Sequence, residues 1–219
     1  MGREDWYRLT TWTKKDQEGF FKKLNRASHF GRKQYLRIQA SYLIDTKLKK
    51  HLAAAEKLLN KLISNYTYLN TELSLIYLEY GRIYYFSKEY EKALKYFKKS
   101  MDYEIIFPYS LTNSYIYYSL TIVRLMEVKK FNKVFKLLME KINTDSITFP
   151  RENYITYSVL SIITKYKGDF DNAKFFRDLA EDNAKAEVNS LWNPRKKKYG
   201  LVKNRIVWLD KLVKKRQLN

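Results

Sequence analysis

Hydrophobic residues recur at helical spacing near both ends of the chain. After Thr13-Lys14-Lys15-Asp16, the segment carries Phe20, Phe21 and Leu24. Near the C-terminus, six apolar residues share one helical face: Leu201, Val202, Ile206, Leu209, Leu212 and Val213. Only six Gly and three Pro occur in 219 residues, whereas an all-β chain needs frequent turn signals. We therefore predict an all-α fold.

The stretch from residue 74 to residue 107 has the most regular pattern. Small residues at Gly81 and Ala93 would let two antiparallel helices approach closely, while aromatic side chains fill the space around that contact. The other positions of the pattern are Tyr77, Tyr80, Tyr84, Tyr90 and Phe97. This pattern resembles the tetratricopeptide (TPR) repeat, although Tyr77 and Tyr80 replace its Trp and Leu and the first Pro comes only at Pro108.

Weaker copies of this pattern recur along the chain. The positions equivalent to Tyr90 are His51, Phe131 and Phe170, so successive anchors are 39, 41 and 39 residues apart. We expect Pro108 and Pro150 each to start the next repeat, because the first turn of a helix does not need the missing N–H. The eight expected helices are 34–45, 49–64, 71–86, 89–103, 110–127, 131–143, 151–166 and 170–188. Asp169 or a neighbour is expected to cap the last of them.

The resemblance implies a right-handed superhelical array of about four antiparallel helix pairs. The array is expected to span residues 34–190, with an N-terminal cap at 1–33 and a basic linker and C-terminal helix at 191–219. Short segments around Trp6-Tyr7, 34–40 and 199–202 are also similar to small bacterial TPR-like proteins, a likeness that names no activity.

In TPR-like arrays the first helix of each pair lines a concave groove. Carried onto this chain, that register predicts a partner-binding site that combines two cations with aromatic and apolar surface. A cation beside aromatic rings suits a peptide carboxylate with a neighbouring apolar side chain. The predicted groove residues are Leu78, Arg82, Tyr85, Phe86, Met126, Lys165 and Tyr166. Leu36, Gln39, Leu43 and Ser158 fall on the same expected face, where packing between repeats is the alternative role.

The net charge of +20 is concentrated at the ends of the chain. Residues 1–34 carry +5, residues 195–219 carry +9 and the 160 residues between them carry only +6. The basic tail begins with Arg195, Lys196, Lys197 and Lys198. Three interpretations of this tail are open. It is a solvated end, or its helix docks on the array or on a partner, or it makes an electrostatic contact with nucleic acid or anionic lipid. Lys-rich composition from AT-rich codon usage also explains such a charge.

The residues that carry catalytic or metal chemistry are sparse. There is no Cys, the two His are 22 residues apart, and no phosphate-binding loop, nucleophile elbow or zinc-protease motif occurs. We expect no enzyme activity, no cofactor and no metal. The start of the chain has no apolar signal core and no stretch is long enough to span a membrane, so a cytoplasmic protein is expected.

These features predict a non-enzymatic module that binds a peptide, helix or protein surface in its groove. One alternative is an immunity or antitoxin-like protein that neutralises a toxin by direct binding, although its positive charge is unlike that of most nuclease inhibitors. The other is a nucleic-acid-binding protein that uses its basic ends.

Overall fold

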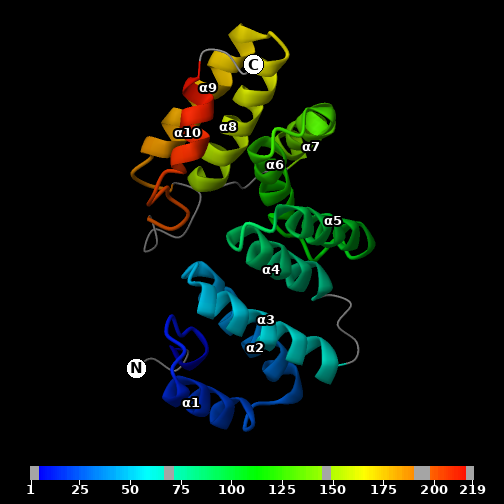
Figure 1. Ribbon diagram of the computed structural model, residues 1–219, viewed down its shortest axis with the longest axis vertical. Coiled ribbons are helices and arrows are strands. Elements are labelled where there is room, and N and C mark those ends of the chain that lie inside the picture. Colours follow the sequence, from blue (N-terminus) through cyan, green and yellow to red (C-terminus); the bar gives the residue numbers. More distant parts are fainter. Residues whose placement is uncertain (1–4, 67–71, 145–148, 190–197, 216–219) are drawn as a thin grey trace. The chain divides into compact units, whose positions relative to one another are not determined.

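The computed structural model describes residues 5–66, 72–144, 149–189 and 198–215. Within these ranges the chain forms ten α-helices and two short 3-10 helices, and it forms no strand (Figure 1). The predicted all-α class is confirmed. The elements are η1 (Asp5–Tyr7), α1 (Lys14–Leu24), α2 (His29–Asp45), α3 (Lys49–Asn65), α4 (Leu73–Phe86), α5 (Tyr90–Ile106), α6 (Ser114–Arg124), η2 (Val128–Lys130), α7 (Phe131–Thr144), α8 (Pro150–Tyr166), α9 (Phe170–Lys185) and α10 (Val207–Lys214).

The chain divides into two compact units, Met1–Ser114 (unit 1) and Tyr115–Asn219 (unit 2). Their boundary falls inside the range predicted as one repeat array. The arrangement of the pairs as a single superhelix therefore stays a prediction, and each unit is described by itself.

Unit 1 contains two closely packed helix pairs, α2 with α3 and α4 with α5. Each pair is joined by a short loop, which makes its helices antiparallel. The approach of α4 to α5 is close because Gly81 is covered by the ring of Phe97; a Cβ atom on Gly81 would lie 2.3 Å from Phe97 Cε1. Ala93 is fully buried in the same pair. The small residues of the predicted repeat therefore lie where the helices meet.

The first residues of unit 1 pack over α2. Trp6, Tyr7 and Tyr35 form an aromatic cluster, with ring centroids 4.5 to 5.2 Å apart. The side-chain amide of Gln39 accepts a hydrogen bond from the Leu9 N–H at 3.0 Å and donates one to the Leu9 carbonyl at 2.8 Å. These contacts satisfy a fully buried polar side chain and fix the N-terminal segment on α2.

Unit 2 contains one closely packed pair, α8 with α9. The Ser161 hydroxyl donates to the Ala173 carbonyl at 2.7 Å, and these residues occupy the positions of Gly81 and Ala93 in the repeat register. The same positions in α6 and α7 hold larger residues, Ile122 and Val134, and both are fully buried.

The final helix is shorter than the sequence pattern predicted. Leu201 and Val202 precede it in non-helical backbone, and α10 begins only at Val207. Gly200, at φ +75°, ends the turn before this segment. Its carbonyl accepts a hydrogen bond from the Arg151 N–H at 2.8 Å. This hydrogen bond joins the segment before α10 to the start of α8.

Candidate functional site

The predicted groove residues of unit 1 lie on α4, and Arg82 is the most informative of them. Its guanidinium donates to Glu79 Oε2 at 2.7 Å and to Ser41 Oγ at 3.2 Å, and it forms a short ion pair with Asp45. Arg82 is 8% exposed. This cation joins α4 to α2 and is part of the packing inside unit 1. A role in holding a partner's carboxylate stays a prediction.

The apolar residues predicted beside Arg82 are also largely covered. Leu78 and Tyr85 are buried, and the ring of Tyr85 contacts those of Phe86 and Tyr90 with centroids 5.4 and 5.8 Å apart. Phe86 is half-buried beneath the ammonium of Lys47, 5.3 Å from its ring centre. Most of this surface is packing within unit 1, the alternative role that the sequence had left open for the groove face.

The other predicted groove residues belong to unit 2. Lys165 donates from its ammonium to the backbone carbonyls of Leu212, Val213 and Lys215, at 3.4 Å for Leu212 and 2.9 Å for Lys215. Burial lowers the pKa of Lys165. Tyr166 is exposed and meets the Phe131 ring edge-on at 5.4 Å, while Met126 is half-buried just after α6. Lys165 therefore caps the C-terminus of α10, where unpaired carbonyls carry partial negative charge.

Of the predicted basic tail, Arg195, Lys196 and Lys197 lie outside the described residues. Lys198 is exposed in the turn before Gly200. The tail's helix has a defined place: α10 packs against α8, as Figure 1 shows.

The docking site of α10 is the candidate functional site. Leu209 is fully buried and Val213 nearly so, which gives α10 an apolar side against the rest of unit 2. The Arg124 guanidinium, at the end of α6, lies 4.7 Å from the centre of the Trp208 ring. α10 thus reaches both α6 and α8, the helices that the repeat register assigns to the groove. A pocket of about 420 Å³ remains between α8, α9 and α10, and Ser158 and Val213 are among its lining residues.

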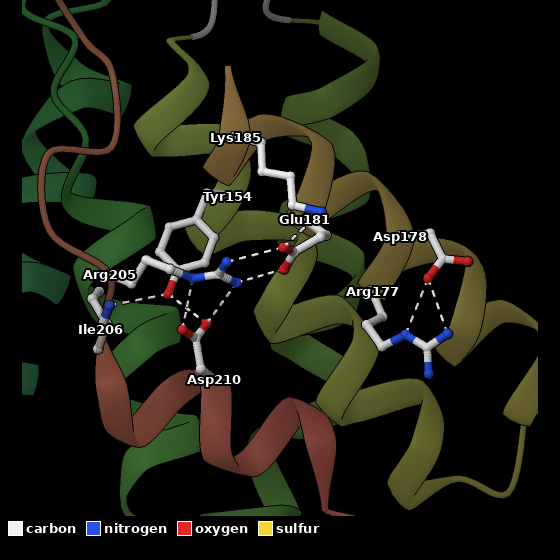
Figure 2. Close-up of polar contacts among 8 residues, drawn as sticks. All are labelled: Tyr154, Arg177, Asp178, Glu181, Lys185, Arg205, Ile206 and Asp210. Carbon is white, nitrogen blue, oxygen red and sulfur yellow. Dashed lines mark hydrogen bonds and ion pairs between the residues drawn. The ribbon is translucent and has the colours of Figure 1, made fainter. Parts of the chain in front are cut away.

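A cluster of charged side chains, here called the clamp, holds the start of α10 at this site (Figure 2). Its members are Arg205, Glu181, Asp210 and Lys185. Arg205 donates two hydrogen bonds to the Glu181 carboxylate, at 2.6 and 3.0 Å, and a third to Asp210 Oδ2 at 2.8 Å. Lys185 also lies 3.2 Å from Glu181. Hydrogen bonds from Arg205 lower the pKa of Glu181 to about 2. The forked guanidinium joins α9 to α10 through two carboxylates at once.

Tyr154 adds a polar contact from α8 to the same clamp. Its hydroxyl donates to Asp210 Oδ1 at 2.8 Å and accepts from the Ile206 N–H at 3.1 Å. Burial, followed by the Asp210 hydrogen bond, raises the pKa of Tyr154 to about 12. The phenol therefore stays protonated and keeps its role as a donor at neutral pH.

None of the clamp residues was predicted from the sequence as part of a site. One signal was present, because Asp210 is the only acidic residue among the ten basic residues of 195–219. A carboxylate in such a segment has several candidate cationic partners nearby in the sequence. Its partner Arg205 lies only five residues away, but Glu181 and Tyr154 are brought in by tertiary structure alone.

In each unit, residues that the sequence assigned to the groove face contact another part of the same unit. Leu36, Gln39 and Leu43 on α2 are fully buried, and Gln39 is bonded to Leu9 of the N-terminal segment. On α8, Lys165 is bonded to α10. Each unit therefore uses a terminal segment of the chain to occupy part of this face.

Within the described ranges, no group of three or more His, Asp or Glu side chains is arranged to hold a metal ion. None of the helices found there is long and apolar enough to cross a bilayer. Comparisons with protein-family models, with curated proteins and with solved structures gave no match.

Proposed function

We propose that the protein is a non-enzymatic interaction module whose helix pairs form a TPR-like array. The close approach of α4 to α5 at Gly81 and of α8 to α9 at Ser161 supports the repeat register. On this proposal, α2, α4, α6 and α8 supply the binding face, and the partner is a protein segment.

The observation that carries the proposal is the way in which α10 is bound within unit 2. An amphipathic helix lies on α6 and α8 with Leu209 and Val213 inward, its C-terminus on Lys165 and its N-terminal side on the Arg205 clamp. Helix-in-groove recognition uses the same parts: apolar anchors on one helix face and polar contacts at the ends. The face that accepts α10 within the chain has the chemistry to accept a similar helix from a partner.

This proposal is tested by separating α10 from its seat in the full-length chain. Leu209→Asp with Val213→Asp places charges where two apolar side chains are buried, so α10 is expected to leave. A fluorescein-labelled peptide of residues 201–215 should then bind the variant and change its anisotropy. The native chain should bind this peptide far more weakly, because its own α10 competes at a high effective concentration.

Two controls make the result specific. The same peptide carrying both Asp substitutions should not bind, and Lys165→Met added to the double variant should weaken binding several-fold because the helix C-terminus loses its cap. If the double variant keeps its helical circular dichroism but does not bind the native peptide, α6 and α8 are not a helix-binding face and the proposal is wrong.

A further inference from the structure

Unit 1 also has a hollow, which the predicted groove does not include. It lies between α1 and α3, has a volume of about 400 Å³, and is lined by Trp12, Gln17, Phe21, Lys50, His51, Ala53, Ala54, Lys57, Leu58 and Lys61. The α3 members follow a helical stripe along one face of that helix. The hollow is therefore a surface built by two helices of one unit.

The charge of this hollow is of one sign. Lys50, Lys57 and Lys61 are all exposed, and no carboxylate is among the lining residues. Among the described residues, Lys50 and Lys57 have no ion-pair partner, while Lys61 lies 4.8 Å from the centre of the Phe21 ring. The pocket beside α10 differs, because its Arg205 and Lys185 are paired with Glu181. The α1–α3 hollow thus presents positive charge that the chain itself does not neutralise.

Aromatic rings lie beside these lysines. Trp12 and Phe21 are both half-buried, and their rings meet at 68° with centroids 6.4 Å apart. Trp12 also packs on Phe20 at 5.4 Å, and the Gln17 amide donates to the Trp12 carbonyl at 3.2 Å. These contacts fix the rings in place, so little side-chain freedom is left to lose when a flat group packs against them.

We propose that this hollow binds single-stranded nucleic acid, with a base packed against the Trp12 and Phe21 rings and phosphates contacted by Lys50, Lys57 and Lys61. A positive groove with aromatic side chains is the common design of proteins that bind single strands. By the helical rise, the three lysines span about 16 Å along α3, a stretch that fits several phosphates rather than one.

The composition favours nucleic acid over an acidic peptide. Lysine is depleted in protein–protein interfaces, whereas lysine ammonium groups readily contact a phosphate backbone. Arginine, which pairs with carboxylates in a forked geometry, is not among the residues that line the hollow. A duplex is a poorer ligand than a single strand, because its stacked bases are not available to the rings.

The test uses the full-length protein and a fluorescein-labelled 12-nucleotide deoxythymidine strand, followed by anisotropy at several salt concentrations. Lys57→Ala with Lys61→Ala should weaken binding at least fivefold. It should also lower the slope of log affinity against log salt by about 1.4, the value for two lost phosphate contacts with a single strand. Trp12→Phe, which keeps a smaller aromatic ring at this position, should weaken binding without changing this slope.

The matched control is Lys133→Ala with Lys136→Ala, which removes the same charge from exposed positions on α7 in the other unit. It should change affinity less than twofold. Equal losses in both double variants would mean attraction to net charge alone and would overturn the proposal. Tighter binding of a labelled poly-glutamate peptide than of the DNA strand would also overturn it and would assign the hollow to an acidic protein segment. Because the hollow lies in unit 1, either result leaves the helix-binding test of unit 2 unaffected.

Discussion

The aromatic ring of Phe97 covers the α-carbon of Gly81, so that a Cβ atom on residue 81 would come within 2.3 Å of Cε1 and 2.4 Å of Cδ1. Phe97 is fully buried, and protein cores are close-packed, so a displaced ring would disturb its neighbours. The α4–α5 pair thus depends on the absence of a side chain at one position.

Replacing Gly81 should therefore destabilise the protein. Gly81→Ala is expected to cost about 1–3 kcal/mol in the free energy of unfolding, and Gly81→Leu more, because the added atoms must displace Phe97. Gly19 in α1 is the control, since a Cβ there meets nothing within 4 Å. Gly19→Ala should stabilise the helix by about 0.5–1 kcal/mol. Urea unfolding measures both, and an unchanged midpoint for Gly81→Leu would contradict the repeat register.

Arg82 gives the second prediction, which concerns stability rather than binding. The Glu79 side chain is only 5% exposed, so Arg82→Met leaves a buried carboxylate without its cation. Breaking a buried pair in this way costs about 3–5 kcal/mol. Adding Glu79→Leu should recover much of that loss, because the stranded charge is then removed as well. Thermal unfolding of the two single variants and the double variant measures the coupling energy between Arg82 and Glu79. If the losses in stability simply add, the two side chains do not stabilise the fold as a pair.

The sequence predicted the helices well where capping residues were readable. α1 starts after Thr13, whose side chain accepts from the Asp16 N–H, and Asp169 caps α9 through the Asn172 N–H at 3.1 Å. Pro150 starts α8 as expected. These signals are local, because one side chain and a backbone N–H two or three residues later decide where the helix begins.

Two other boundaries differ from the predicted ones. α2 begins at His29, five residues before the predicted start, because Ser28 accepts from the Gly31 N–H; this local cap was present in the sequence but was not predicted. The helix expected at 110–127, in the repeat that Pro108 was predicted to start, begins only at Ser114. The intervening loop is fixed to α4 and α5 instead, since Ser74 donates to the Ser110 carbonyl and Glu104 accepts from the Thr112 N–H.

The candidate site was predictable only in part. The register placed Lys165 on a binding face, and the structure shows its ammonium on the carbonyls that end α10. The sequence did not predict that these carbonyls would come from α10. Nor did it predict that Glu181 and Tyr154 would hold the start of α10, because both contacts depend on how the last segment folds back onto α8. Hydrophobic spacing identifies an amphipathic helix but does not say which surface covers its apolar side.

The clamp on α10 gives the third prediction. Glu181→Gln should weaken the two Arg205 hydrogen bonds and release the segment before α10 more often. Because both side chains are about one-third exposed, the effect is expected to be roughly 1 kcal/mol or less. Trypsin cleavage at Lys203 should then be about three- to fivefold faster under native conditions. Asp178→Asn, which alters only the surface pair with Arg177, is the control and should leave the rate unchanged.

His51 gives the last prediction, a pH dependence of stability. Burial, with the nearby charge of Lys50, lowers the pKa of His51 below its ordinary value of 6.5. The unfolded chain then binds a proton more readily than the folded chain, so stability is complete above pH 6.5 and declines as the pH falls through the native pKa. The urea midpoint should drop between pH 7.5 and 5.5. His51→Asn, which keeps a hydrogen-bonding side chain beside the Thr46 hydroxyl, should flatten this profile, whereas His29→Asn at an exposed position should not. Equal slopes in all three proteins would show that His51 does not control the decline.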